Sequence, residues 1–346
     1  MKKPVAITLG DPAGIGPEII VKAFLDAPAV TEGCFVVGDI ATLRRAVKQV
    51  CVDQLALPVA LIESPSEALG LPPRCLPVLQ LGTLLTPAPM GHLSADAGRL
   101  AAECVVWAAQ AALRGEVAAV VTAPLNKEAL ALAGLPHSAY PGHTEMLQAL
   151  AAAHAGRTLA EMPVRMMLAN DELRVVLVSI HVSLRAAIEA VTFDNVLQTL
   201  RITHDSLSTM LGRPPRIAVA GLNPHAGENG LFGREEIDII APAVAVACLQ
   251  GLQVTGPLAP DTVFMRARAK SGLPGAFDVV VAMYHDQGLI PVKYLGVDKG
   301  VNVTLGLPLV RTSPDHGTAF DIAGTGQADA SSLIEAVRVA KSMKCA

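Results

Sequence analysis

Three of the nine histidines follow, at once or after two residues, apolar segments that have the composition of buried strands. In an open parallel sheet, ligands bind beyond the carboxyl ends of the strands. Imidazole is the commonest protein ligand of a transition metal, and three imidazoles with an open position can hold a metal that polarises a substrate oxygen. One such histidine alone is more often a structural residue, so the repetition carries the prediction of a metal site. The segments are 173–180 before His181, 216–222 before His225, and 278–284 before His285.

The residue after His285 leaves three interpretations open. Asp286 could orient the imidazole of His285, act as an acid or base, or cap a helix. Zinc suits three imidazoles, and oxygen ligation by a substrate would also suit cobalt, nickel or manganese. Magnesium is a further candidate for the same site.

Other polar residues stand where they could bind an anion. Lys293, Asn302 and Arg311 each interrupt an apolar run, which suits a phosphate or carboxylate or, equally, solvated surface positions. The turn 141–145 (Pro-Gly-His-Thr-Glu) offers backbone N–H groups, the His143 imidazole and a hydroxyl to an anion. Its alternative is an ordinary helix start with Thr144 as the cap.

Two loops are candidates for nucleotide-binding motifs. The loop 10–16 contains neither GxGxxG nor a Walker A motif, so it is predicted to be a structural turn. The segment 315–324 packs small residues around one histidine and one aspartate, which would let an adenine lie against the backbone and a carboxylate bind ribose hydroxyls. The candidate cofactor-binding residues are His316, Gly317, Thr318, Ala319 and Asp321.

Short β-branched runs alternate with longer Ala/Leu-rich stretches, which predicts βαβ units and a mainly parallel sheet covered on both faces. Ser94 is the expected N-cap of a helix that ends near Gly115, and Pro17 is expected to open the first helix. Predicted strands are 5–9, 34–37 and 117–122; further predicted helices are 194–211, 235–249 with a bend at Pro242, and 332–343.

Composition excludes several classes of protein. The chain has 346 residues, of which 51% are hydrophobic and 17% charged, so a large core is expected. A net charge of −4 and 3% aromatic residues argue against nucleic-acid binding. Six cysteines without a CxxC pair indicate reduced thiols. We find no signal peptide and no membrane-spanning stretch, and therefore expect a cytoplasmic protein.

The motifs together resemble the 4-hydroxythreonine-4-phosphate dehydrogenase (PdxA) family of pyridoxal phosphate biosynthesis, over nearly the whole chain from Gly10 onward. The resemblance implies a two-domain α/β/α subunit of the isocitrate/isopropylmalate dehydrogenase type, not a Rossmann fold. One domain is expected at 1–134 with 306–346 and the other at 135–305, with the active site in the cleft between them at a homodimer interface. The most specific segments are 142–145, 223–228, 283–288 and 300–317.

The resemblance also assigns roles to residues. His181, His225 and His285 would bind the metal, contributed by both subunits. Lys293 is a candidate catalytic group, and Asp286 is a second one, suggested as proton acceptor only by its position beside His285. The implied substrate contacts are His143, Thr144, Lys293, Asn302 and Arg311.

The implied reaction is NAD-dependent oxidation of 4-phosphohydroxy-L-threonine at C3, followed by decarboxylation to 3-amino-2-oxopropyl phosphate. The Asp321 carboxylate would favour NAD over NADP, because it repels a 2′-phosphate. The segments 137–141 and 228–233 resemble a sister branch that oxidises D-threonate or D-erythronate 4-phosphate. The anion-binding residues argue against a branch that oxidises aromatic dihydrodiols. A metal-dependent phosphatase or aldolase is the non-redox alternative, and a scaffold protein is the least favoured.

Overall fold

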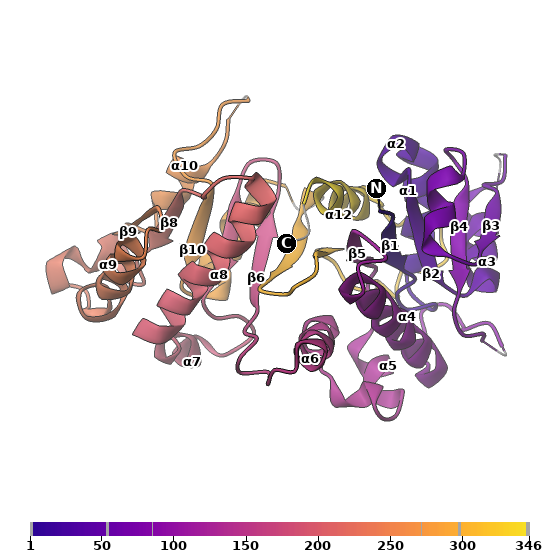
Figure 1. Ribbon diagram of the computed structural model, residues 1–346, viewed down its shortest axis with the longest axis horizontal. Coiled ribbons are helices and arrows are strands. Elements are labelled where there is room, and N and C mark those ends of the chain that lie inside the picture. Colours follow the sequence, from indigo (N-terminus) through magenta and orange to yellow (C-terminus); the bar gives the residue numbers. More distant parts are fainter. Residues whose placement is uncertain (1–2, 53–54, 85, 271, 297–298, 344–346) are drawn as a thin grey trace. The chain divides into compact units, whose positions relative to one another are not determined.

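The computed structural model describes residues 3–52, 55–84, 86–270, 272–296 and 299–343. The chain divides into two compact units, Met1–Pro163 with Leu307–Ala346 and Val164–Gly306. Figure 1 shows the first unit mainly in indigo and purple, and the second mainly in pink and orange. Cys345, one of the six cysteines, lies outside the described residues; the other five are free thiols.

The first unit is built on a parallel sheet. Its strands are β3 (Val59–Ile62), β4 (Leu76–Gln80), β2 (Cys34–Gly38), β1 (Val5–Thr8), β5 (Ala119–Thr122) and β12 (Arg311–Pro314), in that spatial order. Strands β1, β2 and β5 are buried along their whole length, as expected for a parallel sheet that is covered on both faces.

Helices cover both sides of this sheet. α4 (Ala95–Leu113) packs on β1, β2 and β5, and α12 (Ser331–Ser342) packs on β12 and β5 from the opposite side (Figure 1). The remaining elements of the unit are α1 (Gly16–Asp26), α2 (Pro28–Thr31), α3 (Ile40–Val50), η1 (Pro65–Gly70), α5 (Lys127–Leu132), η2 (His137–Ala139) and α6 (His143–Ala155).

Local signals in the first unit have their expected effects. The Ser94 hydroxyl accepts a hydrogen bond from the Ala97 N–H and caps α4, and Pro17 lies in the first turn of α1. Residues 135–163, predicted from the sequence to belong to the second domain, lie in the first unit. The physical reason is α6, which packs against α4 and buries Ala151 and Ala152 beside Leu113.

The second unit has a mixed sheet. Its spatial order is β11 (Val301–Leu305), β6 (Arg165–Ala169), β7 (Arg174–Leu177), β10 (Val279–Ala282), β8 (Ile217–Ala220) and β9 (Val254–Leu258). Strand β6 is antiparallel to both of its neighbours, and the other pairs are parallel. The other elements are α7 (Leu184–Glu189), α8 (Phe193–Leu211), η3 (Pro224–Gly230), η4 (Glu236–Ile240), α9 (Ala241–Leu249), α10 (Val263–Ala267) and α11 (His285–Tyr294).

The predicted helix 235–249 differs from a regular α-helix in its first part. Residues 236–249 form a π-helical turn, η4, that continues into α9. Pro242 has no N–H to donate and its ring crowds the preceding turn, so an ordinary α-helical ladder cannot pass through it. The bend predicted at Pro242 is therefore a widened turn just before it.

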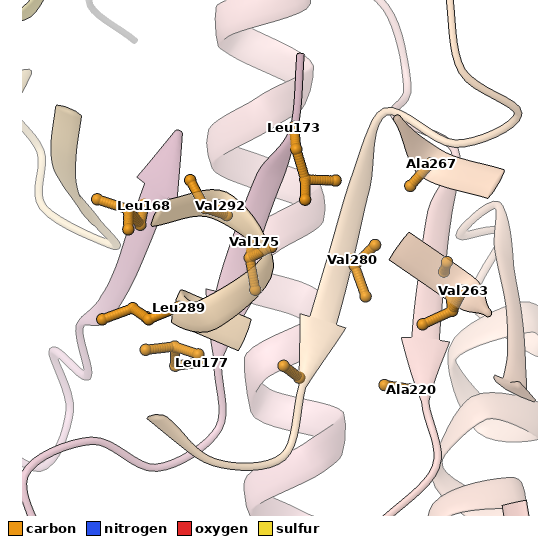
Figure 2. Close-up of a cluster of buried hydrophobic side chains, with 12 residues drawn as sticks. Leu168, Leu173, Val175, Leu177, Ala220, Val263, Ala267, Val280, Leu289 and Val292 are labelled. Carbon is orange, nitrogen blue, oxygen red and sulfur yellow. The ribbon is translucent and has the colours of Figure 1, made fainter. Parts of the chain in front are cut away.

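Figure 2 shows the core that seats α11 on the sheet of the second unit. Leu289 and Val292 of α11 point toward strand residues that include Leu168 and Leu177. The helix also needs Gly288, because a Cβ there would lie 2.6 Å from side-chain atoms of Val175 and Leu177. This packing fixes the start of α11, where His285 lies. No described helix is both long and apolar enough to cross a membrane.

Candidate active site

The three candidate metal histidines all follow strands of the second unit. β7, β10 and β8 are parallel neighbours, so their carboxyl ends share one rim. The rings of His181 and His285 lie 5.6 Å apart between centroids, close enough for both to bind one ion. The His225 ring instead lies 6.3 Å from that of Phe232. Among the described residues, no three His, Cys, Asp or Glu side chains gather into a metal-binding group.

Carboxylates contact the Nδ1 atoms of two of these histidines. Asp286 Oδ1 lies 2.7 Å from Nδ1 of His285, and Glu228 Oε2 lies 3.4 Å from Nδ1 of His225. A carboxylate that accepts the Nδ1 proton leaves Nε2 with its lone pair free for a metal. Asp286 does not cap α11, because the N-cap is Tyr284 and no side chain caps it. The contact favours the orienting role for Asp286.

His225 lies in an unusual backbone segment. Five successive residues, 225–229, all have φ between 42° and 80°, which is a turn of left-handed helix. Only Gly227 among them lacks a Cβ. His225, Ala226 and Glu228 each cost on the order of 1–2 kcal/mol in this conformation, which Asn229 adopts more readily, so surrounding contacts must hold the turn.

Several of the predicted anion-binding side chains belong to the first unit. Arg311 is buried, and its Nε and Nη2 donate to Thr122 Oγ1 over 3.1 and 2.7 Å. Burial lowers the pKa of Arg311 to about 10, while the Glu145 carboxylate acts in the opposite direction. The guanidinium therefore remains charged at neutral pH. Thr312, the next residue, bonds to the Ala336 carbonyl of α12, so Arg311 faces the other side of the sheet.

His143 lies at the start of α6, close to this cation. Burial lowers its pKa well below 6.5, and the charges of Arg311 and Lys127 lower it further. The imidazole is therefore neutral at pH 7. Its Nε2 is buried and has no hydrogen-bond partner among the described residues. Thr144 does not cap α6, whose N-cap is Gly142, so the alternative of a threonine-capped helix start is wrong.

Sequence reasoning missed Lys127. It follows β5 at the same type of strand end as the predicted residues, and its side chain runs beside the Gly142 turn. It also lines a cleft of about 730 Å³ that includes Gly317, Thr318 and Phe320 of the candidate cofactor loop. The rule that predicted the histidines would have found Lys127 if it had been applied to β5.

The loop 10–16 supports the candidate cofactor loop. The Ile15 N–H donates to the Thr318 carbonyl over 3.0 Å, and a Cβ on Gly14 would lie 2.9 Å from that oxygen. Ala319 has a left-handed φ of 40°, while His316 and Asp321 are exposed. The loop 10–16 is therefore a structural turn that supports residues 317–320.

Lys293 and Asn302 belong to the second unit. Lys293 is partly buried in the last turn of α11, and Asn302 lies on β11 opposite Leu168. His143, Thr144 and Arg311 belong to the first unit. The five predicted substrate contacts are therefore divided between the units.

Comparisons with known proteins agree over the length of the chain. The family described as pyridoxal phosphate biosynthetic protein PdxA matches residues 31–340. A 4-hydroxythreonine-4-phosphate dehydrogenase of Beijerinckia indica is 50% identical over 99% of this chain and 95% of its own. A D-threonate 4-phosphate dehydrogenase of Salmonella typhimurium is 47% identical over 98% of each chain.

A solved structure extends the agreement to the fold. The 4-hydroxythreonine-4-phosphate dehydrogenase of Klebsiella pneumoniae has a TM-score of 0.85 and 44% identity, over 98% of this chain and 99% of its own. The predicted α/β class with a mostly parallel sheet is confirmed. The prediction of a dehydrogenase is also confirmed, and the non-redox alternative is set aside. The chain belongs to the PdxA family.

Proposed function

We propose that this chain oxidises the C3 hydroxyl of 4-phosphohydroxy-L-threonine. The resulting β-keto acid then loses CO₂ to give 3-amino-2-oxopropyl phosphate. The 50% identical relative is named for the oxidation of this substrate. The observation that carries the proposal is the neutral imidazole of His143, with an unsatisfied buried Nε2, beside the cations Arg311 and Lys127. This combination suits a phosphate group.

The chemistry of this group of side chains supports an anionic ligand. A protonated Nε2 of a neutral imidazole can donate to a phosphate oxygen without adding charge, and Arg311 and Lys127 attract the anion. Hydrogen bonds between ionised partners are about twice as strong as neutral ones. The Thr144 hydroxyl, next in the chain, is proposed as a further donor. Together these residues would hold the substrate with C3 fixed relative to the oxidant.

A divalent metal is proposed at His181, His225 and His285. The donor set fits, because imidazole suits zinc, cobalt, nickel and manganese, and the rings of His181 and His285 already lie side by side; magnesium remains a candidate. When bound, the metal would polarise the substrate oxygen at C3. Asp286 would hold the Nδ1 proton of His285, while Lys293 and Asn302 would contact the substrate.

We further propose a homodimer whose subunits share the active site. A cleft of about 740 Å³ in the second unit is lined by His225, Asp286 and Gln287, and also by apolar side chains. Met265 and Ile290 in this lining are 67% and 63% exposed. Apolar side chains gathered beside functional residues mark a surface for protein association. A second copy of the chain would cover them and complete the metal ligands.

NAD is proposed as the hydride acceptor. Gly317 and Thr318 line the same cleft as Lys127, so a dinucleotide that lies along the loop would place its phosphates within reach of a cation. The exposed Asp321 would accept hydrogen bonds from the ribose hydroxyls. His316 and Ala319 complete the proposed cofactor loop.

A second substrate class has specific support. The 47% identical relative is named for D-threonate 4-phosphate, and the phosphate-binding and metal-binding residues suit both substrates. The test is NADH production by the metal-reconstituted protein with 4-phosphohydroxy-L-threonine, D-threonate 4-phosphate and D-erythronate 4-phosphate. A kcat/KM at least ~100-fold higher for the amino acid, about 2.7 kcal/mol of discrimination, is expected. The reverse order would assign the sugar acids, and turnover of none would refute both assignments.

A further inference from the structure

We propose that Glu236 and Gln287 are positioning residues that fix in place the segments carrying the metal histidines His225 and His285. The inference rests on the metal site proposed above. Neither side chain needs to touch the metal or the substrate. Both act through the backbone of the segments that carry the histidines, and both are fixed by contacts within the second unit.

Glu236 holds the entrance to the left-handed turn. Its side chain is buried, and Oε1 accepts hydrogen bonds from the backbone N–H groups of Leu222 and Asn223, both over 2.7 Å. Oε2 accepts from the Asn223 side-chain amide over 3.0 Å. Asn223 lies two residues before His225. The carboxylate therefore fixes the chain at the point where it enters its unfavourable conformation.

The close approach of Glu236 requires two glycines. A Cβ on Gly227 would lie 2.7 Å from Glu236 Oε2, and a Cβ on Gly221 would lie 3.1 Å from Oε1. Gly227 also has φ of 80°, a region that residues with side chains rarely adopt. The Glu236 carboxylate therefore packs closely against the backbone both at Gly221, before the left-handed turn, and at Gly227, within it.

Gln287 connects this turn to the second histidine. Its Nε2 donates to the Gly221 carbonyl over 2.7 Å, and its Oε1 accepts from the Met283 N–H over 2.7 Å. Met283 and Gln287 flank His285 along the chain. One amide side chain thus bridges the end of β8, which leads to His225, and the junction between β10 and α11, which carries His285.

The two oxygens of Glu236 both serve as acceptors, which makes a specific substitution informative. Glu236→Gln keeps the shape but turns one oxygen into an NH₂ group that faces N–H donors. The left-handed turn would lose part of its support, and the His225 imidazole would no longer be held in one place. Metal sites require ligand distances within about 0.2 Å of ideal, so affinity should fall before the fold does.

The experiment compares the variants Glu236→Gln and Gln287→Met with the control Asp238→Asn. Asp238 lies on the same π-helical turn, but it is exposed and pairs only with Arg234 in the described structure. Zn²⁺ affinity is measured by chelator competition, and the d–d absorption of the Co²⁺-loaded protein reports ligand geometry. Thermal melting of the metal-free protein reports folding. We expect at least ~10-fold weaker Zn²⁺ binding and altered Co²⁺ bands in both positioning variants, with Asp238→Asn unchanged.

The variant His225→Ala distinguishes failure of the proposed metal site from failure of the positioning role. If His225→Ala leaves Zn²⁺ affinity unchanged, the proposed metal site itself fails. If His225→Ala removes binding while Glu236→Gln and Gln287→Met bind Zn²⁺ like the parent, only the positioning role is refuted. A lower melting temperature with unchanged Zn²⁺ affinity and unchanged Co²⁺ bands would show a purely structural role. Gln287→Met keeps the test decisive if Glu236→Gln does not fold.

Discussion

Thr122→Val should weaken both the fold and the proposed phosphate site through one hydroxyl. Thr122 is buried at the carboxyl end of β5, and its Oγ1 accepts two hydrogen bonds from the Arg311 guanidinium. Valine keeps the β-branched shape that suits a strand but cannot accept a hydrogen bond. The substitution therefore removes an acceptor from a buried cation and changes little else.

The expected magnitude follows from the charge and burial of Arg311. A hydrogen bond from a charged group contributes about 1.5–3 kcal/mol. Because both donors share one oxygen, their contributions do not add, and we expect a loss of roughly 2–3 kcal/mol in the free energy of unfolding. For a unit of this size that corresponds to a decrease of about 4–12 °C in the melting temperature.

The test measures both stability and enzyme kinetics. Urea unfolding gives the free energy, and NADH production gives KM and kcat for the phosphorylated substrate. Since Arg311 is proposed to bind the substrate anion, KM should rise ~10-fold or more, with a smaller effect on kcat. Thr122→Ser keeps the hydroxyl and should keep the parent KM, with a loss of only about 1 kcal/mol in the free energy of unfolding for the missing methyl group. Unchanged unfolding energy would refute the assigned hydrogen bonds, and lost stability with unchanged KM would refute the link from Thr122 to substrate binding.

Three further predictions address other parts of the molecule. Burial raises the pKa of Asp11 to about 6 from an ordinary 3.8, against two backbone N–H donors, so its contribution to stability is present below pH 3.8 and is lost as pH rises through 6. In urea unfolding, the free energy of unfolding of Asp11→Asn should therefore exceed that of the parent by about 3 kcal/mol near pH 8 but by only about 1 kcal/mol near pH 4.5. An equal difference at both pH values would contradict this. Gly227→Ala should lower the stability of the metal-free protein by at least ~2 kcal/mol, while Ala226→Gly, which relieves a strained φ, should not; equal melting temperatures would disprove the strain. Asp321→Ala should lose the preference for NAD over NADP in kcat/KM, and an unchanged ratio would remove the argument from the carboxylate.

The sequence predicted those parts of the site that depend on strand ends. Because β7 and β10 are neighbours, the rule about carboxyl ends correctly expected His181 and His285 to lie together. The same rule covers Lys127, which was overlooked. The predicted strands and the cap at Ser94 also agree with the structure, because these features depend on residues within a few positions of one another.

The contacts that hold the site depend on pairs far apart in the chain. Thr122 and Arg311 are separated by 189 positions, and Gln287 lies 66 positions from Gly221. Nothing in the local pattern around Glu236 distinguishes this buried carboxylate from the half-buried Glu235 before it or the exposed Asp238 after it. A left-handed turn at 225–229 is equally hidden, because three of its five residues, His225, Ala226 and Glu228, disfavour that conformation. Such features follow only from the packed structure.

Energetically unfavourable features of the fold are concentrated beside the proposed ligands. A guanidinium is buried at Arg311, a neutral imidazole with an unsatisfied nitrogen at His143, and a strained turn at His225. The unsatisfied nitrogen and the left-handed backbone lower the stability of the protein without a ligand, because both are unfavourable without compensating contacts. The proposed phosphate would accept a hydrogen bond from the His143 nitrogen and pair with the Arg311 guanidinium, and the proposed metal would bind the imidazole that the strained turn carries. Unfavourable features therefore coincide with the proposed ligands in each unit, which supports the assignment of these residues to substrate and metal binding.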